Sequence, residues 1–287
     1  MSSGDQTESS DGRDGRDGLW SGAAVSPGPS ELAPALVPSF LVIAVPVVLV
    51  GLVFGVLLPG IPWWFGVLLG LLAAVGAVWW LADRADQFVL RSLGPVVPES
   101  RHPIRLTNMV DGLTLAGGVI TPSVLVVDDP AANAMAIRRK DRNHLLFTTG
   151  LVDALDVVEL EAAVAELLTR LRNGDAETAT IGASLLGRPL IDGPLGSLLG
   201  PVGHRTIARL LPPDRDLEAD RQAVGLTRYP PGLIKALGRL QGRDLAPAAG
   251  TAGTAHLWLA DPQAGATSNG DDRRAPLGLR IDALAEL

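Results

Sequence analysis

Residues 39–82 read SFLVIAVPVVLVGLVFGVLLPGIPWWFGVLLGLLAAVGAVWWLA, and this stretch contains no charged residue. It divides into two apolar runs, residues 39–58 and 63–82, joined by the helix-breaking sequence Pro-Gly-Ile-Pro. Each run has about twenty residues, the length that an α-helix needs to cross roughly 30 Å of hydrocarbon. A hairpin buried in a globular core would rarely lack charge over such a length. The stretch therefore predicts a transmembrane hairpin of two helices.

Tryptophans and arginines around the second run predict its orientation. Tryptophans bracket the run, as they do at membrane interfaces, at Trp63, Trp64, Trp79 and Trp80. Basic residues follow it at Arg84, Arg91, Arg101 and Arg105. The linker between the runs has none, so the positive-inside rule places both ends of the hairpin in the cytoplasm. We expect a multi-pass protein of the cell membrane, in contact with the lipid bilayer, with its soluble domain cytoplasmic.

Composition divides the chain into three parts and excludes several functions. Residues 1–37 predict a disordered acidic tail, residues 38–83 contain the hairpin, and residues 84–287 are long enough for one soluble domain. The net charge of −7 argues against nucleic-acid binding, which needs a basic footprint. The chain has no cysteine, which excludes disulfides, thiolate zinc sites and cysteine nucleophiles.

Local patterns in the third part predict an α+β domain with a small sheet. Helical spacing over residues 103–117 is followed by short β-rich runs at residues 123–127, 134–137 and 144–148. Asp156 and Glu159 have the spacing of a capping box, and Asn173-Gly174 is a typical helix end. These signals predict a helix between them.

An ordered series of segments gives the chain a family resemblance. The segments are DDPAANAMAI (128–137), FTTGLVDAL (147–155), VELEAAVAELLTRLRNGD (158–175), DRDLEADRQAVGLTRYPPGLIKALGRL (214–240), HLWLADP (256–262) and APLGLRIDAL (275–284). In this order they resemble the HtpX-like membrane zinc metalloendopeptidases, whose gluzincin fold also includes the CAAX prenyl proteases. The resemblance implies a zincin-like helical domain with a small β-sheet. It also implies that Asn133, Ala134 and Ala136 belong to the strand that binds substrate.

The chain departs from this family at the positions that would carry the chemistry. Members have a His-Glu-x-x-His helix, in which two histidines bind zinc and the glutamate activates water. The resemblance assigns those three positions to Glu166, Leu167 and Arg170. It assigns the third zinc ligand to Asp216, while Asp220 keeps its family position. We therefore expect no catalytic residue and no metal cofactor, because an arginine repels a cation and leucine takes no proton from water.

An ion pair is the predicted replacement for the metal. Arg170 follows Glu166 by four residues, so the two side chains share one helical face. The resemblance brings Asp216 and Asp220 toward them, which would put a guanidinium in the place of zinc. Two simpler interpretations stay open. In the first, Glu166 and Arg170 form an ordinary exposed ion pair. In the second, Asp216 is a first-turn acid that the helix dipole favours.

The segment between the two site helices is a further departure. Residues 177–205 are interrupted by glycine, proline, Arg188 and Asp192, so they are too broken to span a membrane. They predict either a flexible flap or an interfacial segment.

Three functions follow from these observations. The first is a non-catalytic, membrane-anchored relative of the peptidases that binds a protein partner or a membrane-protein client in the former substrate cleft. The second is an active zinc endopeptidase whose ligands come from elsewhere in the chain. The third is a structural subunit of a membrane assembly, with the cleft closed and unused.

Overall fold

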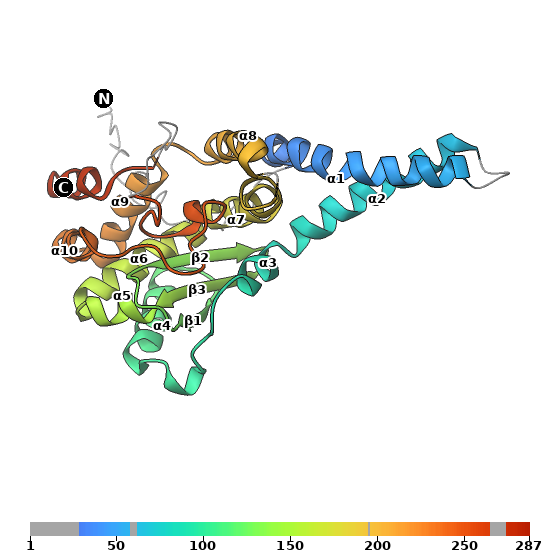
Figure 1. Cartoon of the computed structure of the whole chain (residues 1–287). Helices are drawn as coiled ribbons and strands as arrows, with labels where there is room; N and C mark the ends of the chain where they lie inside the picture. The colour runs from blue at the N-terminus through green and yellow to red at the C-terminus, as the bar shows by residue number, and fades with distance from the viewer. Residues whose placement is uncertain (1–28, 58–61, 195, 265–273) are drawn as a thin grey trace, which may run out of the picture.

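The computed structural model describes residues 29–57, 62–194, 196–264 and 274–287 (Figure 1). Most of the predicted acidic tail, residues 1–28, lies outside the described residues. Helix α1 (Pro29–Leu57) begins before residue 38, the boundary predicted between the tail and the hairpin. Proline suits the first position of a helix because its missing N–H has no partner there.

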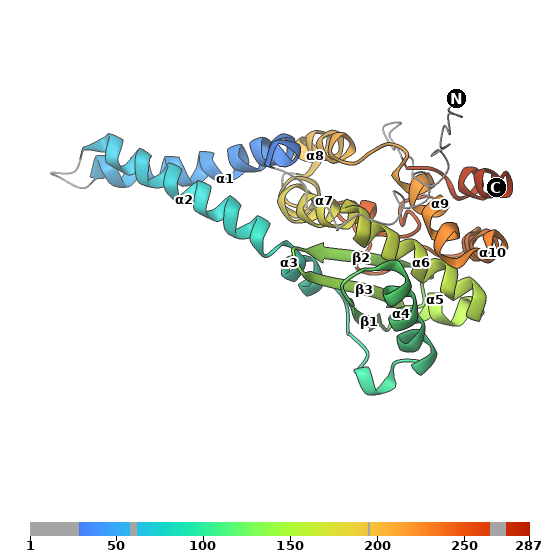
Figure 2. The ribbon, with the colours of Figure 1, turned by 180° about the vertical axis from the view of Figure 1, so that it is seen from behind.

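Helices α1 and α2 (Trp63–Asp83) pack along each other and project away from the rest of the molecule (Figures 1 and 2). Their contact is made by small residues. A Cβ atom added to Gly51 or Gly66 would collide with the backbone of the opposite helix, so glycine permits this close approach. Among the described residues, α2 is the helix that is long and apolar enough to cross a membrane.

The sheet has three strands in the order β1-β3-β2. β1 (Ser123–Val127) runs parallel to β3 (Arg142–Thr148), and β2 (Ala134–Arg139) runs antiparallel to β3. The predicted small sheet is therefore confirmed. Strands β2 and β3 are each longer than the β-rich runs that predicted them. Lys140 takes a left-handed conformation, φ 54°, in the tight turn between them.

Helix α6 (Val157–Asn173) runs through the core of the domain. The predicted capping box of Asp156 and Glu159 starts it, and Gly174, at φ 83°, ends it. Both faces of α6 are buried, because it packs against β2 and against four other helices. The remaining elements of this layer are α4 (Ile104–Gly117), α5 (Thr149–Ala154), α9 (Arg215–Thr227), α10 (Pro230–Leu240) and α11 (Leu277–Ala285).

The segment predicted to be either a flexible flap or an interfacial segment is helical. It forms α7 (Asp175–Gly182), the π-helix η2 (Ala183–Ile191) and α8 (Gly196–Leu210). Leu185, Leu186 and Leu190 are fully buried in a second hydrophobic cluster, together with residues from the base of the hairpin. This burial stabilises the segment, and a flexible flap is therefore wrong for α7 and η2.

Ion pairs fix the hairpin to the domain. Helix α3 (Ala85–Arg91) follows α2 directly, and its buried Asp86 accepts two hydrogen bonds from Arg142, at 2.6 and 2.9 Å. The Arg139 guanidinium donates to the carbonyl of Ala82 at 2.8 Å, near the end of α2. The turn between β2 and β3 therefore holds the last turn of α2 and the start of α3. The short helices η1 (Glu99–Arg101) and η3 (Ala255–Leu257) complete the described elements.

Candidate functional site

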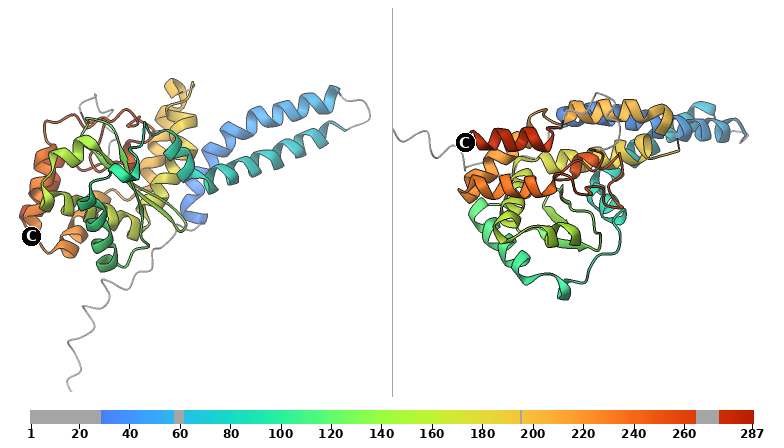
Figure 3. Two further views of the ribbon diagram at one scale, coloured as in Figure 1. Left: turned by 90° about the horizontal axis from the view of Figure 1, so that it is seen from below. Right: turned by 60° about the vertical axis from the view of Figure 1, so that its left-hand side comes forward.

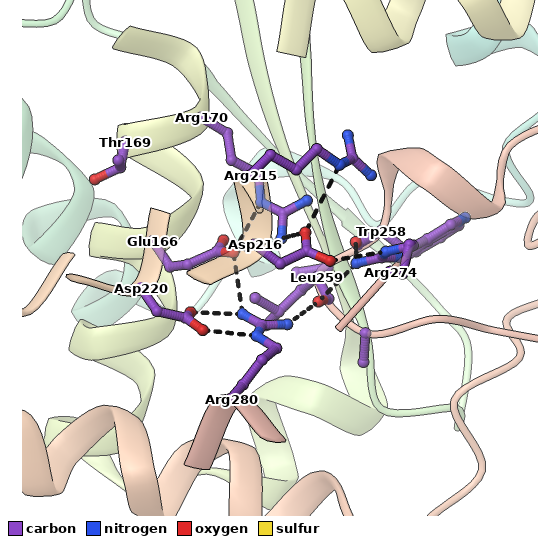
Figure 4. Close-up of polar contacts among 12 residues, drawn as sticks. Glu166, Thr169, Arg170, Arg215, Asp216, Asp220, Trp258, Leu259, Arg274 and Arg280 are labelled. Carbon is purple, nitrogen blue, oxygen red and sulfur yellow. Dashed lines mark hydrogen bonds and ion pairs between the residues drawn. The ribbon is translucent and has the colours of Figure 1, made fainter. Parts of the chain in front are cut away.

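Two helices bring four charged side chains together inside the domain (Figure 4). Helix α6 carries Glu166 and Arg170 one turn apart, and α9 carries Asp216 and Asp220 one turn apart. Positions separated by four residues share one face of a helix, and these two faces meet where α6 packs against α9. All four side chains are buried.

Arg170 bridges the two helices. Its Nε donates to Glu166 Oε1 at 2.8 Å, and its Nη2 donates to Asp216 Oδ1 at 2.9 Å. Glu166 is 0% exposed and Arg170 is 4% exposed, so the interpretation as an ordinary surface ion pair is wrong. Asp216 does lie in the first turn of α9, as its simpler interpretation expected, and it also belongs to this ion-pair network.

Arg280 is a member of the cluster that the sequence analysis missed. It comes from α11, and its Nε and Nη2 donate to the two carboxylate oxygens of Asp220 at 2.7 and 2.6 Å. The same Nη2 lies 3.2 Å from Glu166 Oε1. The sequence analysis grouped Asp220 with Glu166 and Arg170. In the structure, Asp220 pairs with Arg280 of α11 and not with Arg170. An arginine among apolar residues in the segment APLGLRIDAL is the only local signal of this role.

Arg274 and Arg215 were also missed. Arg274 Nε donates to Asp216 Oδ2 at 3.1 Å, and its other nitrogens donate to the carbonyls of Ala255 and Trp258 at 3.0 and 2.9 Å. Arg215 Nε lies 3.8 Å from Asp216 Oδ1. Four guanidiniums and three carboxylates thus give the cluster a formal charge of +1. We call these seven residues the charge cluster.

Burial and the neighbouring arginines shift the pKa of Glu166 and of Asp216 in opposite directions. Burial raises the pKa of Glu166, and Arg170 and Arg280 offset this only in part. Within the described residues, Glu166 Oε2 has no hydrogen-bond partner, which agrees with a costly charge at that atom. Burial alone would also raise the pKa of Asp216, but Arg274 and the other arginines hold it well below its ordinary value. The arginines therefore stabilise the charged form of Asp216 more strongly than that of Glu166.

The predicted substrate strand is covered by the chain itself. Ala134 and Ala136 are buried in β2, at the side of the sheet away from β1. The Leu259 N–H donates to the Ala134 carbonyl at 2.7 Å, and Met135 forms an antiparallel bridge with Trp258. The Asn133 side chain closes the arrangement, because it donates to the Ala260 carbonyl at 2.8 Å and accepts from the Ala260 N–H at 3.1 Å. This edge of β2 is therefore occupied by residues 258–260.

The residues of the charge cluster do not fit the zinc ion that the family resemblance implies. Zinc sites in proteins need three or four lone-pair donors from imidazoles, thiolates or carboxylates. Both oxygens of Asp216 and of Asp220 already accept hydrogen bonds from guanidinium groups. His256 is the histidine held beside Arg215, and its Nε2 lies 2.8 Å from the Ala179 carbonyl. Throughout the described part of the chain, no group of three or more histidine, aspartate or glutamate side chains could hold a metal ion.

Leu167 and one hollow at the surface are not part of the charge cluster. Leu167 is fully buried in the main hydrophobic core, at the position that the resemblance assigns to the general base. A surface hollow of about 480 Å³ lies at the start of α6 and is lined by Asp156, Glu159, Lys235, Gly238 and Arg239. No residue of the charge cluster lines it. The geometry at the cluster can support ion pairing between helices.

Comparison with known proteins found several relatives described as Protease HtpX homolog. No family model matches the chain, and no solved structure matches it. A protein described as Protease HtpX homolog from Dictyoglomus thermophilum is 28% identical, over 77% of this chain and 81% of the relative. Proteins with the same description from Acidiphilium cryptum and Tropheryma whipplei are each 30% identical. These matches cover 68% and 61% of this chain, and 77% and 68% of the relatives.

Proposed function

Because this chain belongs to the HtpX protease family, we propose that it is a membrane-anchored member that has kept the family fold and has no peptidase activity. The observation that carries the proposal is the position of Arg170. Its guanidinium lies between Glu166 and Asp216, where the resemblance to the family assigns a zinc ion. A fixed cation with five hydrogen-bond donors offers no lone pair and no open coordination position.

The general base is also replaced in this proposal. A zinc peptidase needs a carboxylate that takes a proton from the metal-bound water. Leu167 stands at that position and packs into the hydrophobic core, so it has neither the chemistry nor the access to water. The cluster instead links α6, α9 and α11, which is a structural task. The fold proposed for residues 84–287 is accordingly the zincin-like fold with its metal site converted into an ion-pair network.

We propose that α1 crosses the membrane together with α2. The packing of the two helices through Gly51 and Gly66 supports a hairpin, and both present apolar side chains outward along their length. Arg84 and Arg91 follow α2, which favours a cytoplasmic domain. The hairpin, assigned to residues 38–83, would then anchor the soluble domain to the cytoplasmic face.

The occupied edge of β2 favours a structural subunit over a client-binding protein. A client strand could bind there only after residues 258–260 leave, with the loss of their hydrogen bonds to Asn133 and Ala134. Such a partner would be a protein segment in extended form, since strand addition is the way a sheet edge recognises a peptide. We retain this partner-binding role as the second candidate because the covering segment is short.

Two measurements test the proposal on the full-length chain in detergent or nanodiscs. The first is the zinc content together with cleavage of casein in the presence and absence of a chelator. We expect far less than one zinc per chain and no cleavage that the chelator abolishes. A stoichiometric zinc ion with chelator-sensitive cleavage would overturn the proposal and support the active metallopeptidase. A zinc protease added to casein in the same buffer is the positive control for the assay.

The second measurement separates a structural subunit from a client-binding protein. Proteins would be captured from solubilised membranes with the unmodified chain and with Leu259→Pro, which cannot donate to the Ala134 carbonyl. A structural subunit should capture the same partners with both chains. Capture of a client that increases with Leu259→Pro would support binding at the opened edge of β2.

A further inference from the structure

Helix α8 lies beside α1 at the base of the hairpin (Figures 1 and 3). Its inner side is made of small and apolar residues that are buried, among them Gly200, Gly203 and Ile207. A Cβ atom added to Gly203 would come within 2.7 Å of the Ile191 side chain, so α8 sits close against η2. This buried face of α8 therefore packs against the rest of the molecule.

The opposite face of α8 combines apolar and basic side chains. Leu198 is 73% exposed, and Val202, Arg205 and Arg209 are exposed as well. These four positions are three or four residues apart, so they share one face of the helix. The apolar pair lies in the first half of α8 and the arginines lie in the second half. α8 contains no acidic residue.

The surroundings of α8 indicate which surface this face meets. A single exposed leucine is ordinary in a soluble protein. Here the helix that carries it lies beside α1, whose side chains Leu41 and Val45 are also exposed. At the same end of the hairpin, the Arg84 guanidinium lies 5.6 Å from the centre of the Trp80 ring, and that tryptophan is exposed. Tryptophan and arginine beside an apolar helix are typical of the boundary between lipid and water.

We propose that α8 lies in the plane of the membrane surface and binds anionic phospholipids. Leu198 and Val202 enter the boundary of the acyl chains, while Arg209 faces the phosphate groups of the lipids. This arrangement is that of an interfacial amphipathic helix, in which apolar burial and electrostatic attraction act together. The inference rests on the proposed function in one respect, since it requires the hairpin to be embedded in the bilayer.

The absence of cysteine allows a direct test with single labels on the full-length chain. Leu198→Cys would carry a nitroxide in nanodiscs of phosphatidylcholine and phosphatidylglycerol, and its collisions with oxygen and with a water-soluble nickel chelate would be compared. Leu72→Cys, on the exposed side of α2, reports the lipid interior. Leu115→Cys, on α4 and 85% exposed, reports a water-facing leucine on another part of the domain.

We expect the label at position 198 to favour oxygen over the nickel chelate, as the label at position 72 does, and the label at position 115 to show the reverse. The inference is overturned if position 198 behaves as position 115 while position 72 reports lipid. If position 72 also reports water, the hairpin is outside the bilayer, and the membrane anchor of the proposed function fails together with the inference.

The role of the arginines has its own readout. Raising the share of phosphatidylglycerol should increase the protection of the label at position 198 from the nickel chelate. Arg209→Gln should remove most of this dependence on anionic lipid, whereas Arg243→Gln, an exposed arginine beyond the end of α10, should keep it. Equal dependence in both variants would show that α8 does not bind anionic lipid through Arg209.

Discussion

Replacing Arg280 with methionine should destabilise the soluble domain strongly. The side chain is 1% exposed and donates two hydrogen bonds to Asp220, one to Glu166 and one, at 2.7 Å, to the Leu259 carbonyl. Methionine replaces the aliphatic part of the arginine side chain and has no donor, so it would leave two buried carboxylates without this partner. Removal of one member of a buried ion pair costs about 3–5 kcal/mol. For a domain of this size, ~1 kcal/mol corresponds to about 2–4 °C, so we expect the Tm to fall by roughly 6–20 °C.

Thermal unfolding of the full chain in detergent micelles, followed by circular dichroism, measures this change. Arg243→Met is the matched control, because Arg243 is exposed and should tolerate the substitution within about 0.5 kcal/mol. The double variant Arg280→Met with Asp220→Leu should recover part of the loss, since it replaces the ion pair by apolar side chains. The reasoning is refuted if Arg280→Met lowers the Tm no more than Arg243→Met does.

Three further predictions concern pH, the hairpin and the covered sheet edge. Because the folded pKa of Asp216 is held well below its ordinary value of 3.8, its carboxylate adds stability above that pH and loses it as the pH falls toward the folded pKa. The Tm of the unmodified chain should therefore fall more steeply with acid, from about pH 4 downward, than that of Asp216→Asn; parallel curves would contradict this. Gly66→Val should separate α1 from α2 and make the hairpin sensitive to added protease in micelles, whereas Gly76→Val should not, because nothing lies within 4 Å of a Cβ there. Leu259→Pro should speed amide hydrogen exchange in β2 around Ala134 if residues 258–260 protect this edge, and unchanged exchange would show that they do not.

The charge cluster shows how far local sequence signals reach. The helical spacing of Glu166 and Arg170 predicts that their side chains meet, because both belong to one turn of α6. The approach of Asp216 was expected only from the family resemblance. Arg274 and Arg280 had no such signal, since they lie more than fifty residues from their carboxylate partners along the chain. Whether an arginine in a short apolar helix faces solvent or a buried acid depends on where that helix packs.

The sequence alone determined the elements whose signals are local. The uncharged stretch around the hairpin linker, the capping box at Asp156, the glycine at position 174 and the β-rich runs each act within a few residues, and the structure confirms the helix and the strands that they predict. Only the tertiary structure decided that residues 258–260 cover the edge of β2, that η2 is buried at the base of the hairpin, and that four arginines share three carboxylates. The reason is physical. Backbone capping and hydrophobic periodicity are properties of neighbouring residues, whereas the pairing of a buried charge depends on which distant segment packing brings within hydrogen-bond distance.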